Sequence, residues 1–179
     1  MKAARVKISQ YFQPIIGTIP WRVKPGVGSF LTFDFGARIK DHGHLRGQWH
    51  LWIYLSNWKL FHGDRQLVDS DTDRKRITIS TRRLEQETLS AVDFEQRTQE
   101  TTFFFDGFRL VVSPANYLEN VDERDNYWMF FMPENEVLAV GPSGPRLEQG
   151  SDTNSQAHRR KQESESHTIG LQRRISLED

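Results

Sequence analysis

The segment of residues 48–55, QWHLWIYL, constrains the fold of this chain more than any other stretch. Successive side chains of an extended strand point to opposite faces of a sheet. One face of this strand carries Trp49, Leu51, Ile53 and Leu55, and the opposite face carries His50, Trp52 and Tyr54. Because both faces carry large side chains, this pattern predicts a central strand that is covered on both sides.

Other segments show the same alternation or are rich in residues that favour strands. Asp106-Gly107 separates two of them and is a strong signal for a hairpin turn. Together with 48–55, the predicted strands are 29–35, 58–62, 87–94, 99–105, 108–113, 127–132 and 137–140. Short strands with tight turns favour an antiparallel sheet, so we expect a mainly antiparallel β-sheet of about 7–8 strands, rolled or stacked.

Two segments favour a helix. Residues 4–13 precede Pro14, where a helix would stop. Residues 71–84 follow Ser70, and carboxylates near the start of such a helix suit its dipole. The same segment contains RITIST, which also alternates as a strand would, so both interpretations stay open. With one or two helices packed on the sheet, the predicted class is α+β.

The aromatic residues mark the extent of the folded unit. All 5 Trp, 4 Tyr and 12 Phe lie at or before position 131. From Gly141 onward the chain is rich in Gly, Pro, Ser, Gln and mixed charge, and such a segment buries too little apolar surface to offset its ordering entropy. We therefore expect a partly helical N-terminal arm over 1–26, a core domain over 27–142 and a disordered polar tail over 143–179.

Composition narrows the classes of function. Lys plus Arg equal Asp plus Glu at 24 each, so the chain has no global field that would attract nucleic acid or an anionic membrane. There are no cysteines, which excludes disulfides, thiolate metal sites and cysteine nucleophiles. The basic N-terminus lacks the apolar stretch of a secretory signal, and we expect a cytoplasmic protein.

Several segments together resemble a group of small, single-domain bacterial proteins of unknown function. The matching stretches are GSFLTFDFG (28–36), GQWHLWIYLSNWKL (47–60) and DSDTDR (69–74). The group pattern reads GSFLxxxFG, then GxWHLWIY, then W, then SxSDR. The resemblance covers about residues 27–140 and implies a helix after Asp71 and an intracellular bacterial origin. It implies no activity, and the tail after Gly141 departs from the pattern.

Each short motif that could indicate a catalytic or metal site lacks the other residues that such a site requires. Asp34-Phe35-Gly36 spells the magnesium motif of kinases, but the accompanying motifs are missing. Residues 69–73, DSDTD, begin like a calcium loop, yet Arg74 and Ser80 stand where that loop needs Gly and Glu. His42 and His44 are two alternate residues without a fixed third ligand. We therefore expect no cofactor and no metal.

Two hypotheses of function remain. The first is a non-enzymatic interaction protein, immunity-like or accessory, that binds another protein; its candidate binding residues are His50, Trp52, Tyr54, Tyr117 and Tyr127. A homo-oligomer is compatible with it, whereas membrane and nucleic-acid partners are not expected. The second is a small enzyme or ligand-binding barrel with a pocket around His50 and Tyr54, in which Asp34 could take part. A pocket that holds His50 beside a carboxylate would favour the second.

Overall fold

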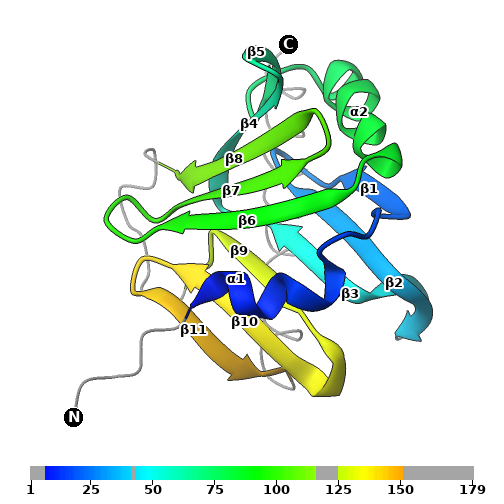
Figure 1. Ribbon diagram of the computed structural model, residues 1–179, viewed down its shortest axis with the longest axis vertical. Coiled ribbons are helices and arrows are strands. Elements are labelled where there is room, and N and C mark those ends of the chain that lie inside the picture. Colours follow the sequence, from blue (N-terminus) through cyan, green and yellow to red (C-terminus); the bar gives the residue numbers. More distant parts are fainter. Residues whose placement is uncertain (1–6, 42, 116–124, 151–179) are drawn as a thin grey trace, which may run out of the picture.

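The computed structural model describes residues 7–41, 43–115 and 125–150 (Figure 1). Within these ranges the chain forms an α+β fold in which eleven strands build two sheets. Every pair of neighbouring strands in both sheets is antiparallel. The predicted class, a mainly antiparallel sheet structure with helices packed on it, is confirmed.

The first sheet has six strands in the order β1-β2-β3-β9-β10-β11. Its strands are β1 (Arg22–Pro25), β2 (Leu31–Asp41), β3 (His44–Ile53), β9 (Trp128–Phe131), β10 (Glu136–Gly141) and β11 (Gly144–Gln149). The strand predicted at 48–55 is the second half of β3, and it lies between β2 and β9 as an interior strand.

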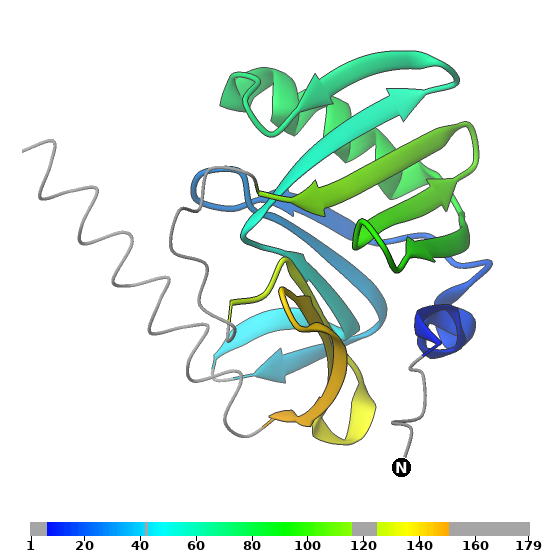
Figure 2. The same ribbon diagram turned by 90° about the vertical axis from the view of Figure 1, so that its left-hand side faces the viewer.

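The second sheet has five strands in the order β5-β4-β8-β7-β6. Its strands are β4 (Ser56–His62), β5 (Arg65–Asp69), β6 (Leu89–Glu95), β7 (Glu100–Phe105) and β8 (Phe108–Pro114). The chain passes from the first sheet to the second between β3 and β4, where only Tyr54 and Leu55 separate the strands. Figure 2 shows the two sheets one above the other.

Two helices lie at the sides of the two sheets (Figures 1 and 2). Helix α1 (Ile8–Phe12) continues into a 3₁₀ turn, Gln13–Ile15, and contacts β6. Helix α2 (Arg74–Arg82) continues into a 3₁₀ turn, Arg83–Gln86, and contacts β1 and β5. A third 3₁₀ turn, Pro133–Asn135, joins β9 to β10.

The main core fills the space between the sheets and is built largely of rings. Phe12 of α1 is fully buried, stacks on Phe130 of β9 with ring centroids 4.2 Å apart, and meets Phe103 of β7 edge-on at 5.7 Å. Buried rings of this size contribute much of the apolar area that stabilises a domain. The short helix α1 therefore links the two sheets through one aromatic side chain.

The sequence distinguished helix from strand poorly at 71–84, and the structure resolves the choice as a helix. Asp73 is the N-cap, and its Oδ1 accepts a hydrogen bond from the Arg76 N–H at 3.0 Å. Ile77 and Thr81, one turn apart, are buried on the face toward the domain. The helix begins at Arg74, three residues after the start of the expected range 71–84, so Asp71 and Asp73 precede its first turn.

Three strands escaped the sequence prediction: β1, β5 and β11. Each is short and contains proline or several charged residues, so none shows a clear apolar alternation. In addition, β2 continues past Gly36, where we expected the strand to end. Gly36 adopts a φ of +69°, a β-bulge shifts the register between Phe35 and Arg38, and the strand then runs on to Asp41.

Strand β11 changes the expected boundary of the folded unit. It begins at Gly144, inside the segment 143–179 that we expected to be a disordered tail, and all six of its residues pair with β10. The folded unit therefore reaches at least Gln149. Similarly, α1 and β1 lie inside the expected arm 1–26 and pack on the core. Residues 151–179, which make up most of the expected tail, lie outside the described residues.

Candidate functional site

The aromatic side chains of the predicted face are enclosed. Trp52 and Tyr54 are 7% and 6% exposed. They belong to a second apolar cluster, separate from the main core, whose other buried members are Met129, Phe131, Val137 and Ala139. The rings of Trp52 and Tyr54 meet edge-on at 5.5 Å. Neither ring is therefore exposed as a flat surface on which a base or a sugar could stack.

His50 lies at the border of this cluster and is joined to a buried carboxylate. Asp34 is opposite His50 in the β2–β3 register, and His50 Nδ1 lies 2.8 Å from Asp34 Oδ1. Arg22 is opposite Asp34 in the β1–β2 register, and its Nε donates to Asp34 Oδ2 at 2.7 Å. One row across three strands thus carries a cation, a carboxylate and an imidazole.

Gly47 completes the surroundings of the carboxylate. Its N–H donates to Asp34 Oδ1 at 2.6 Å. A Cβ atom at position 47 would lie 2.6 Å from the carbonyl oxygen of Phe35 and 2.7 Å from its nitrogen, closer than real contacts allow. Only glycine can therefore bring the backbone of β3 this near to Asp34.

These contacts determine the charge of Asp34, which is fully buried. Burial alone would raise the pKa of its carboxyl group, but the hydrogen bond and charge of His50, with the bonds from Gly47 and Arg22, outweigh it and lower the pKa. Asp34 is therefore an acceptor, and the hydrogen in its contact with His50 resides on Nδ1. The contact orients the imidazole ring, with Nε2 directed away from the carboxylate.

Two further candidate binding residues were the tyrosines Tyr117 and Tyr127. Tyr127 is 8% exposed and packs in the main core. Its N–H donates to Val140 at 2.7 Å, and its carbonyl accepts from the Tyr54 N–H at 2.8 Å. Burial, and secondly the charge of Asp125, raises the pKa of its phenol. Tyr117 lies outside the described residues.

The segment that resembled a calcium loop has a structural role in the turn before α2. Asp69 Oδ1 accepts from the Thr72 hydroxyl at 2.7 Å and from the Asp71 N–H at 3.2 Å. The Thr72 bond is the main cause of a lowered Asp69 pKa. Over the described ranges there is no group of three or more His, Asp or Glu residues that could hold a metal ion. His42 lies outside those ranges, so the expectation for its loop stays a prediction.

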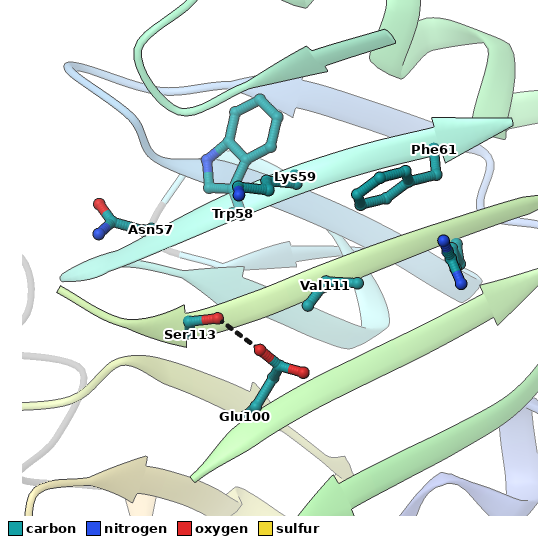
Figure 3. Close-up of a pocket in the computed structure, with 8 residues that line it drawn as sticks. Asn57, Trp58, Lys59, Phe61, Glu100, Val111 and Ser113 are labelled. Carbon is teal, nitrogen blue, oxygen red and sulfur yellow. Dashed lines mark hydrogen bonds between the residues drawn. The ribbon is translucent and has the colours of Figure 1, made fainter. Parts of the chain in front are cut away.

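A groove of about 330 Å³ lies on the outer face of the five-stranded sheet (Figure 3), whereas His50 lies on β3 of the other sheet. It is lined by residues of β4, β8 and β7: Asn57, Trp58, Lys59, Phe61, Arg109, Val111, Ser113 and Glu100. At one end, the Ser113 hydroxyl donates to Glu100 Oε2 at 2.9 Å. At the other end, the Arg109 guanidinium lies over the Phe61 ring, 4.6 Å from its centroid.

Arg109 has an unsatisfied donor in this groove. Its Nε is shielded from water and has no hydrogen-bond acceptor among the residues that the structure describes. Leaving a buried donor without an acceptor costs about 1–3 kcal/mol. Phe104, which is opposite Arg109 on β7, is 37% exposed. The Phe61–Arg109–Phe104 row therefore presents a cation between two rings on the surface of the sheet.

We did not predict this groove from the sequence, although the outward-facing residues of two of its strands indicated it. Because β4 and β8 alternate, their buried positions fix which residues point outward. Those outward residues are Asn57, Lys59 and Phe61 on one strand and Arg109, Val111 and Ser113 on the other. A solvated sheet face usually carries polar residues, so the mixture of rings, Arg and Val on this face was informative.

No family model, curated protein or solved structure matches this chain. In the part of the chain that the structure describes, no helix is long and apolar enough to cross a membrane.

Proposed function

We propose that this protein is a binding domain that holds a segment of another protein in the groove on the outer face of β4, β8 and β7. The observation that carries the proposal is Arg109, whose guanidinium lies over Phe61 and whose Nε has no acceptor among the described residues. Arginine and aromatic residues are enriched among the residues that dominate binding energy at protein interfaces. The other N–H groups of the guanidinium can donate to an oxygen acceptor on a partner, and a small movement of the Arg109 side chain on binding would bring the shielded Nε into the same contact.

The charges of the groove indicate the chemistry of that segment. Lys59 and Arg109 are cationic, and Glu100 already accepts from Ser113 at the far end. A partner carboxylate near Arg109, followed by an apolar side chain over Phe61 and Phe104, would match this order. Carboxylates accept charge-assisted hydrogen bonds from arginine, which are about twice as strong as neutral ones.

Photo-crosslinking in the cells that make the protein tests this proposal. A benzoylphenylalanine at position 104 is expected to form an adduct with one polypeptide, whereas the same group at exposed position 40 on β2 of the other sheet is not. Arg109→Ala should reduce the adduct strongly, because loss of a hot-spot arginine weakens binding by about 2 kcal/mol or more, roughly 30-fold in Kd. Arg97→Ala, an exposed arginine outside the groove, is the matched control.

Equal adducts at positions 104 and 40, or an adduct at 104 that Arg109→Ala leaves unchanged, would show that the groove is not the binding surface. The absence of any adduct, together with turnover of a metabolite by the purified protein, would show that the protein is an enzyme instead.

One observation supports the second candidate, a ligand-binding or catalytic site at His50. The Asp34–His50 pair orients an imidazole in the way that a general base requires. Against it, Tyr54, the other residue expected in that pocket, is enclosed in the aromatic cluster. A small molecule that raises the Tm of the wild type but not of His50→Asn would favour this candidate over protein binding.

A further inference from the structure

Helix α2 exposes a surface of unusual composition. Ile77 and Thr81 are 4% and 0% exposed and face the domain, whereas Ile79 is 61% exposed at the centre of the opposite face. Residues three and four positions away are the neighbours of a residue on a helix surface. For Ile79 all four of these neighbours are basic: Lys75, Arg76, Arg82 and Arg83. We call Ile79 and these four residues the basic face of α2.

The positive charge of this face is largely uncompensated. Residues 74–84 include five basic residues and no acidic one. Arg76 lies 4.0 Å from the exposed carboxylate of Asp73, a contact that contributes little. Within the described ranges, Lys75 and Arg82 form no ion pair, and Arg83 lies over the Phe108 ring at 4.8 Å. The fifth cation, Arg74, has a structural role and donates to the carbonyls of Pro25 and Gly26.

Helix stability does not account for this arrangement. Cations in the first turn oppose the positive end of the helix dipole and therefore disfavour the helix. The first turn of α2 begins Arg74, Lys75, Arg76 and contains no acidic residue. The Asp73 N-cap offsets part of that cost. The exposed cations at positions 75 and 76 thus disfavour the helix on which they lie, which is expected of residues that serve binding.

We propose that the basic face of α2 is a second docking surface, whose partner is an acidic protein surface with an apolar socket for Ile79. Charge complementarity selects an anionic partner. An apolar residue ringed by charged ones matches the centre-and-rim pattern of protein interfaces. A membrane would need a broad apolar face, but the other apolar residues of this helix, Ile77 and Leu84, are buried in the domain. A phosphate backbone would have no use for Ile79.

Binding of defined probes to the full-length protein tests this inference independently of the groove. The probes are a Glu-rich helical peptide with one row of leucines, poly-glutamate of equal charge, a DNA duplex and phosphatidylglycerol vesicles, all followed by fluorescence anisotropy or sedimentation. The leucine-bearing peptide is expected to bind at least about tenfold more tightly than poly-glutamate. Ile79→Ser should remove that difference and leave the weak binding of poly-glutamate.

The charge-reversed variant Lys75→Glu/Arg76→Glu separates binding from folding. Acidic residues in the first turn suit the helix dipole, so its Tm should equal or exceed that of the wild type. Its affinity for the leucine-bearing peptide should nevertheless fall at least about tenfold. Lys40→Glu/Arg97→Glu makes the same charge change at exposed positions on β2 and beyond β6, and should retain most of the affinity.

Other results would overturn the inference. Duplex or vesicles bound more tightly than the peptide, with no effect of Ile79→Ser, would identify a phosphate-bearing partner. Equal losses in the two charge-reversed variants would show attraction to overall charge and no docking surface. If the leucine-bearing peptide does not bind the wild type even at low salt, the basic face of α2 is not a docking surface for an acidic partner.

Discussion

Asp34 and His50 lie directly opposite each other on β2 and β3, and the carboxylate holds the imidazole through an Nδ1–Oδ1 contact of 2.8 Å. Arg22 extends this contact to β1, so the row ties three neighbouring strands of the six-stranded sheet together. Asp34 is fully buried, whereas the side chain of Arg22 is 35% exposed. The buried carboxylate therefore needs these partners to offset its lost hydration, whereas the guanidinium of Arg22 is also partly hydrated.

Replacing Asp34 with Asn should destabilise the protein and flatten its response to acid. Breaking a buried ion pair costs about 3–5 kcal/mol, and because Arg22 reaches water we expect about 3 kcal/mol. The folded pKa of Asp34 lies below its unfolded value of about 3.9. Its contribution is therefore complete above that value and is lost as the pH falls through the folded pKa.

The free energy of unfolding in urea, measured from neutral pH down to about pH 3, checks this prediction. Wild type should lose more stability over the acid range than Asp34→Asn does. Asp64→Asn, at an exposed turn position, controls for the general effect of removing a carboxylate. Parallel acid curves for wild type and Asp34→Asn would contradict the lowered pKa.

Gly47→Ala should destabilise the same site through the backbone. The added Cβ would lie 2.6 Å from the Phe35 carbonyl oxygen, so β2 and β3 must separate and the N–H bond to Asp34 must lengthen. Overpacking of this kind costs about 1–3 kcal/mol. Chemical denaturation measures the loss, and the backbone amide signal of residue 47 should also shift. An unchanged midpoint would mean that the strands adjust without strain.

How far the sequence predicts this fold depends on the kind of residue. Trp49, Leu51 and Ile53 alternate with polar or aromatic partners, and this periodicity predicted the interior strand and its two faces correctly. The Asp34–His50 contact was not predictable in the same way. It joins residues 16 positions apart, and the bulge at Gly36 changes the register between them and the hairpin end.

The missed elements share a physical cause. Strand β11, GPRLEQ, lies at a sheet edge, where proline and charged residues are tolerated, so its composition resembles that of the tail that follows. The groove depends on β4 and β8 being neighbours, although 45 or more residues separate them. The basic face of α2 was hidden in a chain of zero net charge, because its pattern becomes visible only at helical spacing.

Trp52 and Phe104 provide a test of the two sheet faces. Trp52 is 7% exposed in the second apolar cluster, so Trp52→Ala should cost roughly 3–5 kcal/mol. Phe104 is 37% exposed on the groove face, and Phe104→Ala should cost under about 1 kcal/mol. Thermal and urea unfolding of both variants give the comparison. Comparable losses would show that the two faces are equally enclosed.

Truncation tests the corrected boundary of the folded unit. Ending the chain after Gly144 removes β11, which pairs along its whole length with β10 and whose Arg146 bonds to Asn126 in the segment before β9. The newly exposed edge of β10 contains Val137, Leu138 and Val140, which are buried in the complete protein. We expect this truncation to lower the Tm by several degrees and to promote aggregation, because an apolar unpaired edge is a template for strand addition.

Ending the chain after Gly150 retains every pair of the β10–β11 ladder and should leave the Tm nearly unchanged. If both truncations have the same Tm, β11 contributes nothing to stability; if the longer one also loses several degrees, residues 151–179 contribute to the fold as well.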